Sequence, residues 1–247
     1  HAIYRLPLWL LGLSPARYVF CAVDSSNNHL NIIDNRTERC VIHSLDYEIY
    51  QEDIEYDDNY YGKIVFLDQS LSIHPDFLIA PVNSLPPKEK YFDEMCGLFE
   101  SLEKRYAVEV IVSSHPRSDL SLLSKYYKGR KVFKGRTNDL VKNSSFCVAH
   151  YSTSINYAVL HNKPLLLVTT SDVEKCSHMQ RCINAYASYF NVSAFNISND
   201  VDLSFIDDLG IDENVYGQYK KDFIKSEGSL VGNFWTIVGR KINLLFK

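Results

Sequence analysis

The chain has 247 residues, which is enough for one large domain or two small ones around a buried core. Hydrophobic residues make up 46% of it and charged residues 23%, a balance that excludes a disordered protein. Because 26 Lys and Arg stand against 30 Asp and Glu, for a net charge of −4, a nucleic-acid-binding surface is not expected.

The N-terminal part of the chain carries two signals. The apolar run from Leu6 to Leu13 is shorter than the about 20 residues that span a bilayer, so it predicts a packed helix, with contact to a membrane surface as the alternative. Residues 48–61 are acidic and rich in tyrosine, and they lack a clean periodicity, which predicts a surface segment or linker. We therefore divide the chain into an N-terminal portion, 1–62, and a larger domain, 63–247.

After residue 62, short apolar runs alternate with helical patterns. Runs of this kind are typical of strands buried on both faces, and their alternation with helices predicts an α/β fold with a doubly wound, parallel, Rossmann-like sheet. Two C-terminal helices follow it. The predicted strands are 63–67, 108–112, 132–133, 146–149 and 165–168, and the predicted helices are 88–106, 119–127, 138–142 after an N-cap at Thr137, 154–161, 213–225 and 229–246.

Polar clusters follow three of the predicted strands. In open α/β sheets, ligands bind beyond the carboxyl ends of the strands, so we expect the three clusters to gather at one edge of the sheet. They are Asp68 with Gln69, then the run from Ser113 to Arg117, then the run from His150 to Ser154.

The last of these clusters places Ser152, Thr153 and Ser154 where a predicted strand turns into a helix. Backbone N–H groups and the positive dipole end at a helix start favour an anion, and hydroxyl groups there can donate to phosphate oxygens. Serine and threonine are also the commonest N-caps, so capping is the alternative interpretation.

The second cluster contains His115, followed by Pro116, which restricts the local backbone, and Arg117. A histidine and an arginine beside a phosphate site can stabilise negative charge as it develops on a leaving group. A second His-Pro dipeptide begins at His74 without a strand before it, which predicts a turn. We therefore interpret the dipeptide at His115 as the site.

Two carboxylates are candidates for a general base. Asp68 ends a predicted strand, and capping of a turn is the equal alternative for it; Asp46 stands in the N-terminal portion, where it suits a cleft between domains. The sequence has no GxGxxG, GxxxxGK[ST] or GxSxG pattern, which argues against a dinucleotide site, a P-loop and a hydrolase elbow. The six cysteines form no CxxC pair, which predicts free thiols in a reducing cytoplasm.

Four segments of the larger domain form an ordered set. They are EVIVSSHPR at 109–117, FKGRTNDLVK at 133–142, AHYSTS at 149–154 and NKPL at 162–165. Their order resembles the C-terminal half of bacterial GT-B glycosyltransferases of surface-polysaccharide synthesis, and the likeness covers about residues 63–170. It is to sialyltransferases, polysialyltransferases and Kdo transferases, which carry an HP motif and a later Ser-Ser/Thr motif.

This resemblance implies a GT-B-like fold with a reduced or truncated N-terminal portion, because about 60 residues before Lys63 are too few for a full acceptor domain. It implies transfer of a nonulosonic acid, such as sialic acid, or of Kdo from a CMP-activated donor to a glycan or glycolipid acceptor. His115 and Pro116 match the HP motif, and Ser152, Thr153 and Ser154 match the Ser-Ser/Thr motif, both at the donor phosphate. A carboxylate base and no metal are implied. The expected location is the cytoplasm, with the inner face of the membrane as the alternative.

Two further functions remain open at this point. CDP-glycerol or CDP-ribitol phosphotransfer for teichoic-type polymers requires a second histidine as base, for which His150 is the available residue, and the net charge of −4 argues against it. A non-catalytic sugar-nucleotide-binding subunit is the alternative from a different class, and the short N-terminal portion is what supports it.

Overall fold

The computed structural model describes residues 10, 12–23, 32–52, 60–74, 85–198 and 202–244. The chain forms two compact units, His1–Glu52 together with Gly217–Lys247, and Asp53–Tyr216. In this division the C-terminal helices belong with the N-terminal strands, whereas the sequence analysis assigns them to the larger domain. The predicted boundary after residue 62 stays a prediction.

The described residues of the smaller unit include a pair of short parallel strands and helices α1 (Leu45–Gln51) and α10 (Phe234–Asn243). Strand β1 (Tyr18–Cys21) pairs with β2 (Glu38–Val41), and helix α1 begins at Ser44, whose Oγ accepts a hydrogen bond from the Tyr47 N–H. Helix α10 begins five residues later than predicted, because Asn233 caps it. The sequence analysis missed β1 and β2, which are only four residues long and mix charged with apolar side chains.

The chain enters this unit again through α9 (Glu213–Tyr219), which continues into a π-helical turn (Lys220–Ile224), close to the predicted helix at 213–225. Most of the predicted helix at Leu6–Leu13, and much of the predicted surface segment at 48–61, lie outside the described residues. No helix among the residues that are described is long and apolar enough to cross a membrane.

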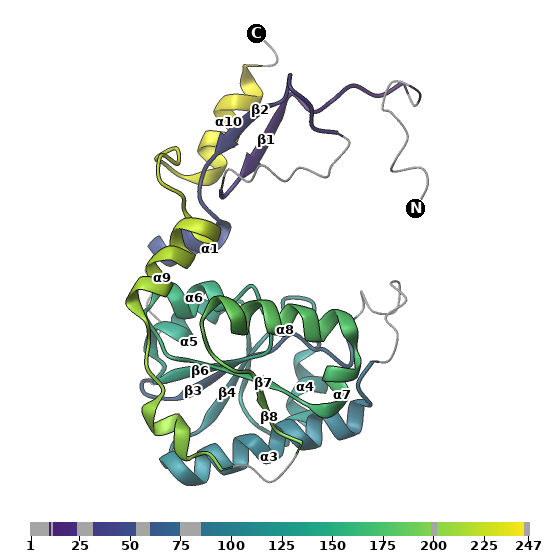
Figure 1. Ribbon diagram of the computed structural model, residues 1–247, viewed down its shortest axis with the longest axis vertical. Helices are drawn as coiled ribbons and strands as arrows, with labels where there is room; N and C mark the ends of the chain where they lie inside the picture. The colour runs from purple at the N-terminus through teal and green to yellow at the C-terminus, as the bar shows by residue number, and fades with distance from the viewer. Residues whose placement is uncertain are drawn as a thin grey trace. The chain divides into compact units, whose positions relative to one another are not determined.

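The larger unit is an α/β fold built on a parallel six-stranded sheet, which confirms the predicted fold class (Figure 1). The central strands are apolar and almost entirely buried on both faces, as expected for a sheet covered by helices on each side. In spatial order the strands are β5 (Val132–Lys134), β4 (Val110–Ser114), β3 (Ile64–Leu67), β6 (Phe146–Ala149), β7 (Leu165–Thr169) and β8 (Phe195–Asn196).

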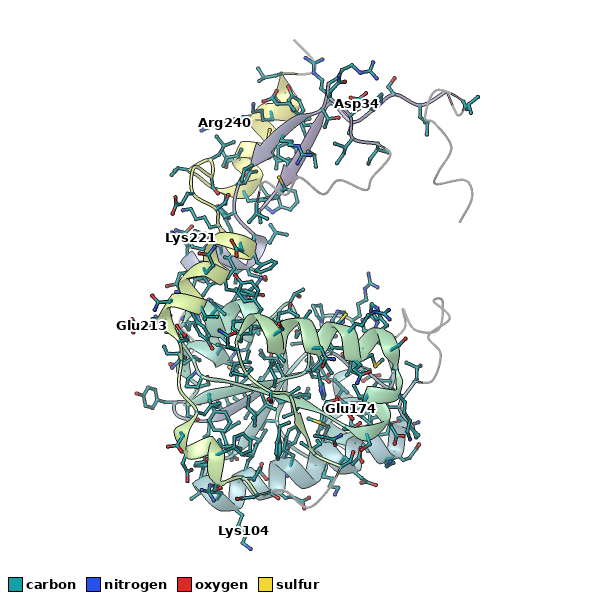
Figure 2. The ribbon with its side chains drawn as sticks, viewed as in Figure 1. Asp34, Lys104, Glu174, Glu213, Lys221 and Arg240 are labelled. Atoms are coloured by element: carbon teal, nitrogen blue, oxygen red, sulfur yellow. The ribbon has the colours of Figure 1, made fainter. Side chains whose placement is uncertain are left out.

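Helices cover both faces of this sheet. Figure 1 shows α3 (Lys88–Tyr106) on one side and α5 (Thr137–Asn143) and α6 (Ile155–Leu160) on the other. Helix α3 has the predicted bounds, and exposed Lys104 near its end points away from the sheet (Figure 2). Helix α4 (Leu120–Tyr126) packs on the α3 side, since the ring of Tyr127 at its end meets Phe66 of β3.

Aromatic side chains fill the core between the sheet and α3. Phe66 lies 5.3 Å from Phe99 and 6.1 Å from Tyr127, measured between ring centroids, and all three are fully buried. Tyr127 is also within 5.0 Å of Phe92 in an edge-to-face contact. Buried aromatic rings of this kind each remove a large apolar area from water and stabilise the packing of α3 on the sheet.

Two local predictions need correction. Strand β4 ends at Ser114 rather than at residue 112, so Ser113 and Ser114 are strand residues and are buried. Thr137 is the first residue of α5 and not its N-cap, because its hydroxyl is bonded to Ser113 Oγ at 2.8 Å across the sheet edge; Arg136 stands at the cap position instead.

The region after β7 is more helical than the sequence analysis proposes. It contains α7 (Ser171–Lys175), α8 (Ser177–Tyr189) and a 3-10 turn (Ser204–Asp208), none of which was predicted. All six cysteines are free thiols, as predicted, and four of them are buried.

The order of the strands places a crevice beside β3. The chain runs from β3 outward through β4 to β5 and then returns to β6, which pairs with the other edge of β3. At such a reversal the connections leave β3 and β6 toward opposite faces of the sheet, and the carboxyl ends of the two strands bound an open crevice. The three polar clusters of the sequence analysis follow β3, β4 and β6.

Candidate functional site

A pocket of about 310 Å³ opens at the carboxyl ends of β3, β4 and β6. Each of these strands contributes side chains to it from the residues that directly follow the strand, and α8 adds one more. Its lining residues are Gln69, Leu71, His74, His115, Tyr151, Ser152, Thr153 and His178. The structure therefore brings His115 together with Ser152 and Thr153 in one pocket.

His115 lies in the loop that follows β4 and is half-buried. Its Nδ1 accepts a hydrogen bond from the Arg117 backbone N–H at 3.2 Å. Because Nδ1 acts as an acceptor, the neutral ring carries its proton on Nε2. The imidazole can therefore serve as a hydrogen-bond donor from Nε2 without a positive charge.

His74 belongs to the same pocket, although the sequence analysis interprets its His-Pro dipeptide as a turn away from the site. The rings of His74 and His115 meet edge to face with their centroids 4.6 Å apart. A turn is present just before His74, where the Ile73 N–H donates to the Ser70 carbonyl at 2.9 Å. This turn directs the chain so that His74 lies beside the loop that follows β4. Pro75 lies outside the described residues.

The serine-rich segment reaches the pocket through its side chains rather than through a helix start. The first N–H groups of α6 donate to the carbonyls of residues 152 to 154, and the Ser154 N–H donates to Ser152 Oγ at 3.1 Å. Those N–H groups are therefore used within the turn, and α6 is only six residues long. Ser152 Oγ acts as an acceptor in this turn, which leaves its O–H to donate toward the pocket. Ser154 does not line the pocket and stands at the N-cap position.

Gln69 connects two of the strands that form the pocket. Its Oε1 accepts a hydrogen bond from the Tyr151 backbone N–H at 2.9 Å, which ties the residue after β3 to the segment after β6. Burial raises the pKa of Tyr151 well above its ordinary value, so its hydroxyl stays protonated. Pro116 and Arg117 are exposed and are not among the lining residues.

His150, a predicted phosphate ligand, lies entirely in the core. Its Nδ1 is 2.7 Å from the Val168 carbonyl, and its Nε2 is 2.9 Å from the Tyr91 hydroxyl. Nδ1 therefore donates and Nε2 accepts, and burial lowers the pKa of His150 to about 4. Both ring nitrogens are used inside the protein, so the structure offers neither of them to a phosphate or to a proton from substrate.

The two predicted bases also lie away from the pocket lining. Asp68 is 3% exposed, and its carboxylate accepts hydrogen bonds from Ser70 and from Tyr127, which matches the turn-capping alternative. Burial raises the pKa of Asp68, while the hydrogen bonds from these two residues lower it. Asp46 is in the first turn of α1, in the smaller unit.

The chemistry of the lining favours an anion. Among the described residues, the lining contains three imidazoles, three hydroxyl-bearing side chains and an amide, and no carboxylate. Phosphate oxygens accept hydrogen bonds from groups of all these kinds, and none of these described side chains repels a negative charge. Within the described residues, no group of three or more His, Cys, Asp or Glu side chains is arranged to hold a metal ion.

The expectation that the sequence contains no DxD motif, and hence no divalent-metal site of that kind, is wrong in its premise. The segment DVD at 200–202 has this spacing, and its first two residues lie outside the described part of the chain. The carboxylate of Asp202 accepts hydrogen bonds from the N–H and hydroxyl of Ser204, both at 2.8 Å, which caps the following 3-10 turn. Asp202 does not line the pocket that contains His115.

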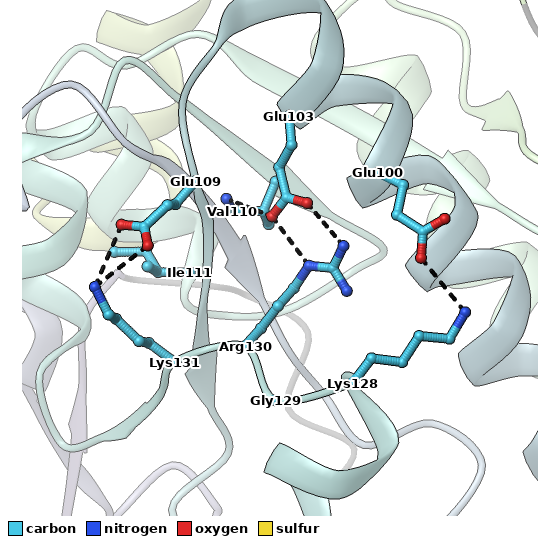
Figure 3. Close-up of a pocket in the computed structure, with 9 residues that line it drawn as sticks. All are labelled: Glu100, Glu103, Glu109, Val110, Ile111, Lys128, Gly129, Arg130 and Lys131. Atoms are coloured by element: carbon cyan, nitrogen blue, oxygen red, sulfur yellow. Dashed lines mark hydrogen bonds and ion pairs between the residues drawn. The ribbon is translucent and has the colours of Figure 1, made fainter.

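A second pocket, of about 340 Å³, lies at the opposite, amino-terminal ends of β4 and β5 (Figure 3). It is strongly charged, but each of its acidic side chains is paired with a basic one across the pocket, as the dashed lines in Figure 3 show. The pairs of Glu100 and Glu103 hold α3 to the connection between α4 and β5, and the pair of Glu109 joins the start of β4 to the same connection, which is a structural role. The pairs are Arg130 with Glu103 at 2.8 Å, Lys131 with Glu109 at 3.3 Å and Lys128 with Glu100 at 3.4 Å.

Comparison with known proteins gives a distant likeness to a solved structure. No protein-family model and no curated protein matches the sequence. Among solved structures, the chain is similar to S. aureus MnaA in complex with UDP, with 13% identity and a TM-score of 0.39 over 85% of this chain. The chain spans 56% of the length of that structure. A likeness at this level does not identify a function.

Proposed function

We propose that the chain is a glycosyltransferase that uses a nucleotide-activated sugar, with CMP as the nucleotide. The observation that carries the proposal is the shared pocket of His115, Ser152 and Thr153 at the crevice beside β3. These residues match the HP and Ser-Ser/Thr motifs of the transferases that the sequence resembles. Their side chains supply hydrogen-bond donors, which is what a donor phosphate requires.

The proposed reaction breaks the bond between the anomeric carbon of the sugar and a phosphate oxygen of CMP. The acceptor hydroxyl attacks the anomeric carbon and loses its proton to a base, and the bond electrons leave with the CMP phosphate. Negative charge therefore develops on the phosphate in the transition state, where donors fixed in advance are most effective. His115 Nε2–H and the hydroxyls of Ser152 and Thr153 are the donors that we assign to it.

The base is assigned outside the pocket lining. Asp68 is unsuited, because its carboxylate is buried and accepts hydrogen bonds from two neighbouring residues. Asp46 belongs to the smaller unit, and its role as base stays a prediction from the sequence. The sugar is proposed to be a nonulosonic acid or Kdo, and the acceptor a glycan or glycolipid, both on the strength of the resemblance.

A non-catalytic sugar-nucleotide-binding subunit is the second candidate, because no carboxylate is among the described residues of the pocket lining. The phosphotransferase alternative is not supported further, since it needs His150 as base and this side chain is enclosed in the core. A turnover assay distinguishes the glycosyltransferase from the binding subunit.

Binding and turnover assays with this chain test the proposal. We expect CMP to bind more tightly than UDP or GDP in calorimetry, and CMP to be released from CMP-sialic acid or CMP-Kdo in the presence of a glycan acceptor. His115→Ala and Ser152→Ala should each lower the rate of CMP release by about tenfold or more, the loss of one or two donors to a charged group.

Two matched variants control for simple loss of a side chain. His161→Ala removes an imidazole at the far end of α6, and Ser145→Ala removes an exposed hydroxyl at the amino-terminal end of β6. Both should leave CMP binding and release unchanged. CMP binding without any turnover would favour the binding subunit, and no binding of any nucleotide, or equal effects of the site and control variants, would refute the assignment of the pocket.

A further inference from the structure

The loop that carries His115 is held in shape by its own backbone. The Ser118 N–H donates to the His115 carbonyl at 3.0 Å, and the Arg117 N–H donates to His115 Nδ1 at 3.2 Å. The orientation of the imidazole therefore depends on this short turn keeping its geometry. Because the turn is at the surface, its position needs support from the sheet behind it.

That support comes from a line of side chains that ends in the core. Ser118 Oγ is 2.8 Å from Ser70 Oγ, and Ser70 Oγ donates to Asp68 Oδ2 at 2.9 Å. Asp68 Oδ1 accepts from the Ser70 N–H and from the Tyr127 hydroxyl, each at 2.9 Å. Ser70 has a φ of 53°, a left-handed conformation that is uncommon for serine, and its two bonds to Asp68 stabilise it there.

The hydrogen bonds of this line run in one direction. The Ser70 hydroxyl donates its hydrogen to Asp68 Oδ2. The lone pairs of Ser70 Oγ then accept the hydroxyl hydrogen of Ser118. Every donor in the line thus points toward Asp68, and the carboxyl group, which accepts from Ser70 and Tyr127, gives the two serine hydroxyls a single orientation.

We propose that Asp68 is a positioning residue, which acts through Ser70 and Ser118 to hold the His115 imidazole in its place in the pocket. The inference rests on the proposed function, since it assigns His115 a donor role toward the phosphate. It replaces the predicted role of Asp68 as a base, which its burial and its hydrogen bonds oppose.

The test compares two serines close together in the chain. Ser118→Ala removes the link to Ser70, whereas Ser121→Ala removes a hydroxyl of α4 that is bonded only to Asp119 at 2.8 Å among the contacts described. Ser118→Ala should lower the rate of CMP release by about tenfold, and Ser118→Thr, which restores the hydroxyl, should return the rate to within about twofold of wild type. Ser121→Ala should behave as wild type.

A second readout does not depend on turnover. The nitrogen chemical shifts of the His115 ring in NMR report its tautomer and hydrogen bonding. We expect Ser118→Ala and Asp68→Asn to move the Nδ1 signal, and Ser121→Ala to leave it unchanged. Should Asp68→Asn not fold, the two serine variants decide the question alone.

The outcomes separate this inference from the proposed function. If wild type releases no CMP from any donor, the proposed function fails while the ring signals still decide whether Asp68 positions His115. If Ser118→Ala leaves both the ring signals and the rate like those of Ser121→Ala in a folded protein, Asp68 does not position His115 and the inference is overturned.

Discussion

Lowering the pH from about 7.5 to about 5 is expected to destabilise the larger unit by about 2 kcal/mol through His150 alone. This side chain is fully buried, with Nδ1 donating to the Val168 carbonyl and Nε2 accepting from the Tyr91 hydroxyl. Protonation of Nε2 would put a charge into the core and would remove the acceptor for Tyr91. The folded protein therefore resists protonation that the unfolded chain accepts.

The magnitude follows from the two pKa values of His150. Its pKa falls from the ordinary 6.5 to about 4 because burial penalises the charged form. Between these values the unfolded state binds more protons than the folded state, so stability is fully present above the unfolded pKa and is lost as the pH falls toward about 4. At about pH 5, roughly 1.5 pH units below the unfolded pKa, the loss is about 2 kcal/mol.

Chemical denaturation at a series of pH values measures this effect. Other groups also titrate in this range, so the useful quantity is the difference between wild type and His150→Gln. Glutamine has a donor and an acceptor for the same two partners but does not titrate. We expect the free energy of unfolding of the variant to fall less between the two pH values, by about 2 kcal/mol. Parallel pH dependences for the two proteins would refute the argument and would mean that His150 is accessible to protons in the folded state.

Two further predictions concern stability away from the site. Glu103→Gln removes the charge that pairs with Arg130 and should lower the free energy of unfolding by about 1–3 kcal/mol in urea denaturation, with CMP binding unchanged. A loss of CMP binding in this variant would mean that the charged pocket of Figure 3 takes part in the function. Ala107 ends α3 with a φ of 52°, a left-handed conformation that glycine adopts without strain, so Ala107→Gly should raise the free energy of unfolding by about 1 kcal/mol and with it the melting temperature. Gly129 has a φ of 80°, so Gly129→Ala should lower the melting temperature. The same sign for both changes would contradict this account of backbone strain.

The sequence by itself determined the architecture of the larger unit. Runs such as 64–67 and 146–149 are apolar throughout, and only a sheet covered on both faces can bury them, so their pattern is sufficient to predict parallel strands. The periodicity of 88–106 likewise predicts α3 with its observed bounds. Because ligands bind beyond the carboxyl ends of such strands, the same pattern places His115 and Ser152 on one edge of the sheet.

Only the tertiary structure decided which polar residues at that edge face the pocket. His150 and Ser152 are two residues apart, yet one is enclosed by Val168 and Tyr91 and the other lines the pocket. His74 reaches the pocket through a turn that holds it against His115. These outcomes depend on where a side chain points and on partners far away in the chain, which a one-dimensional pattern of polar and apolar residues does not contain.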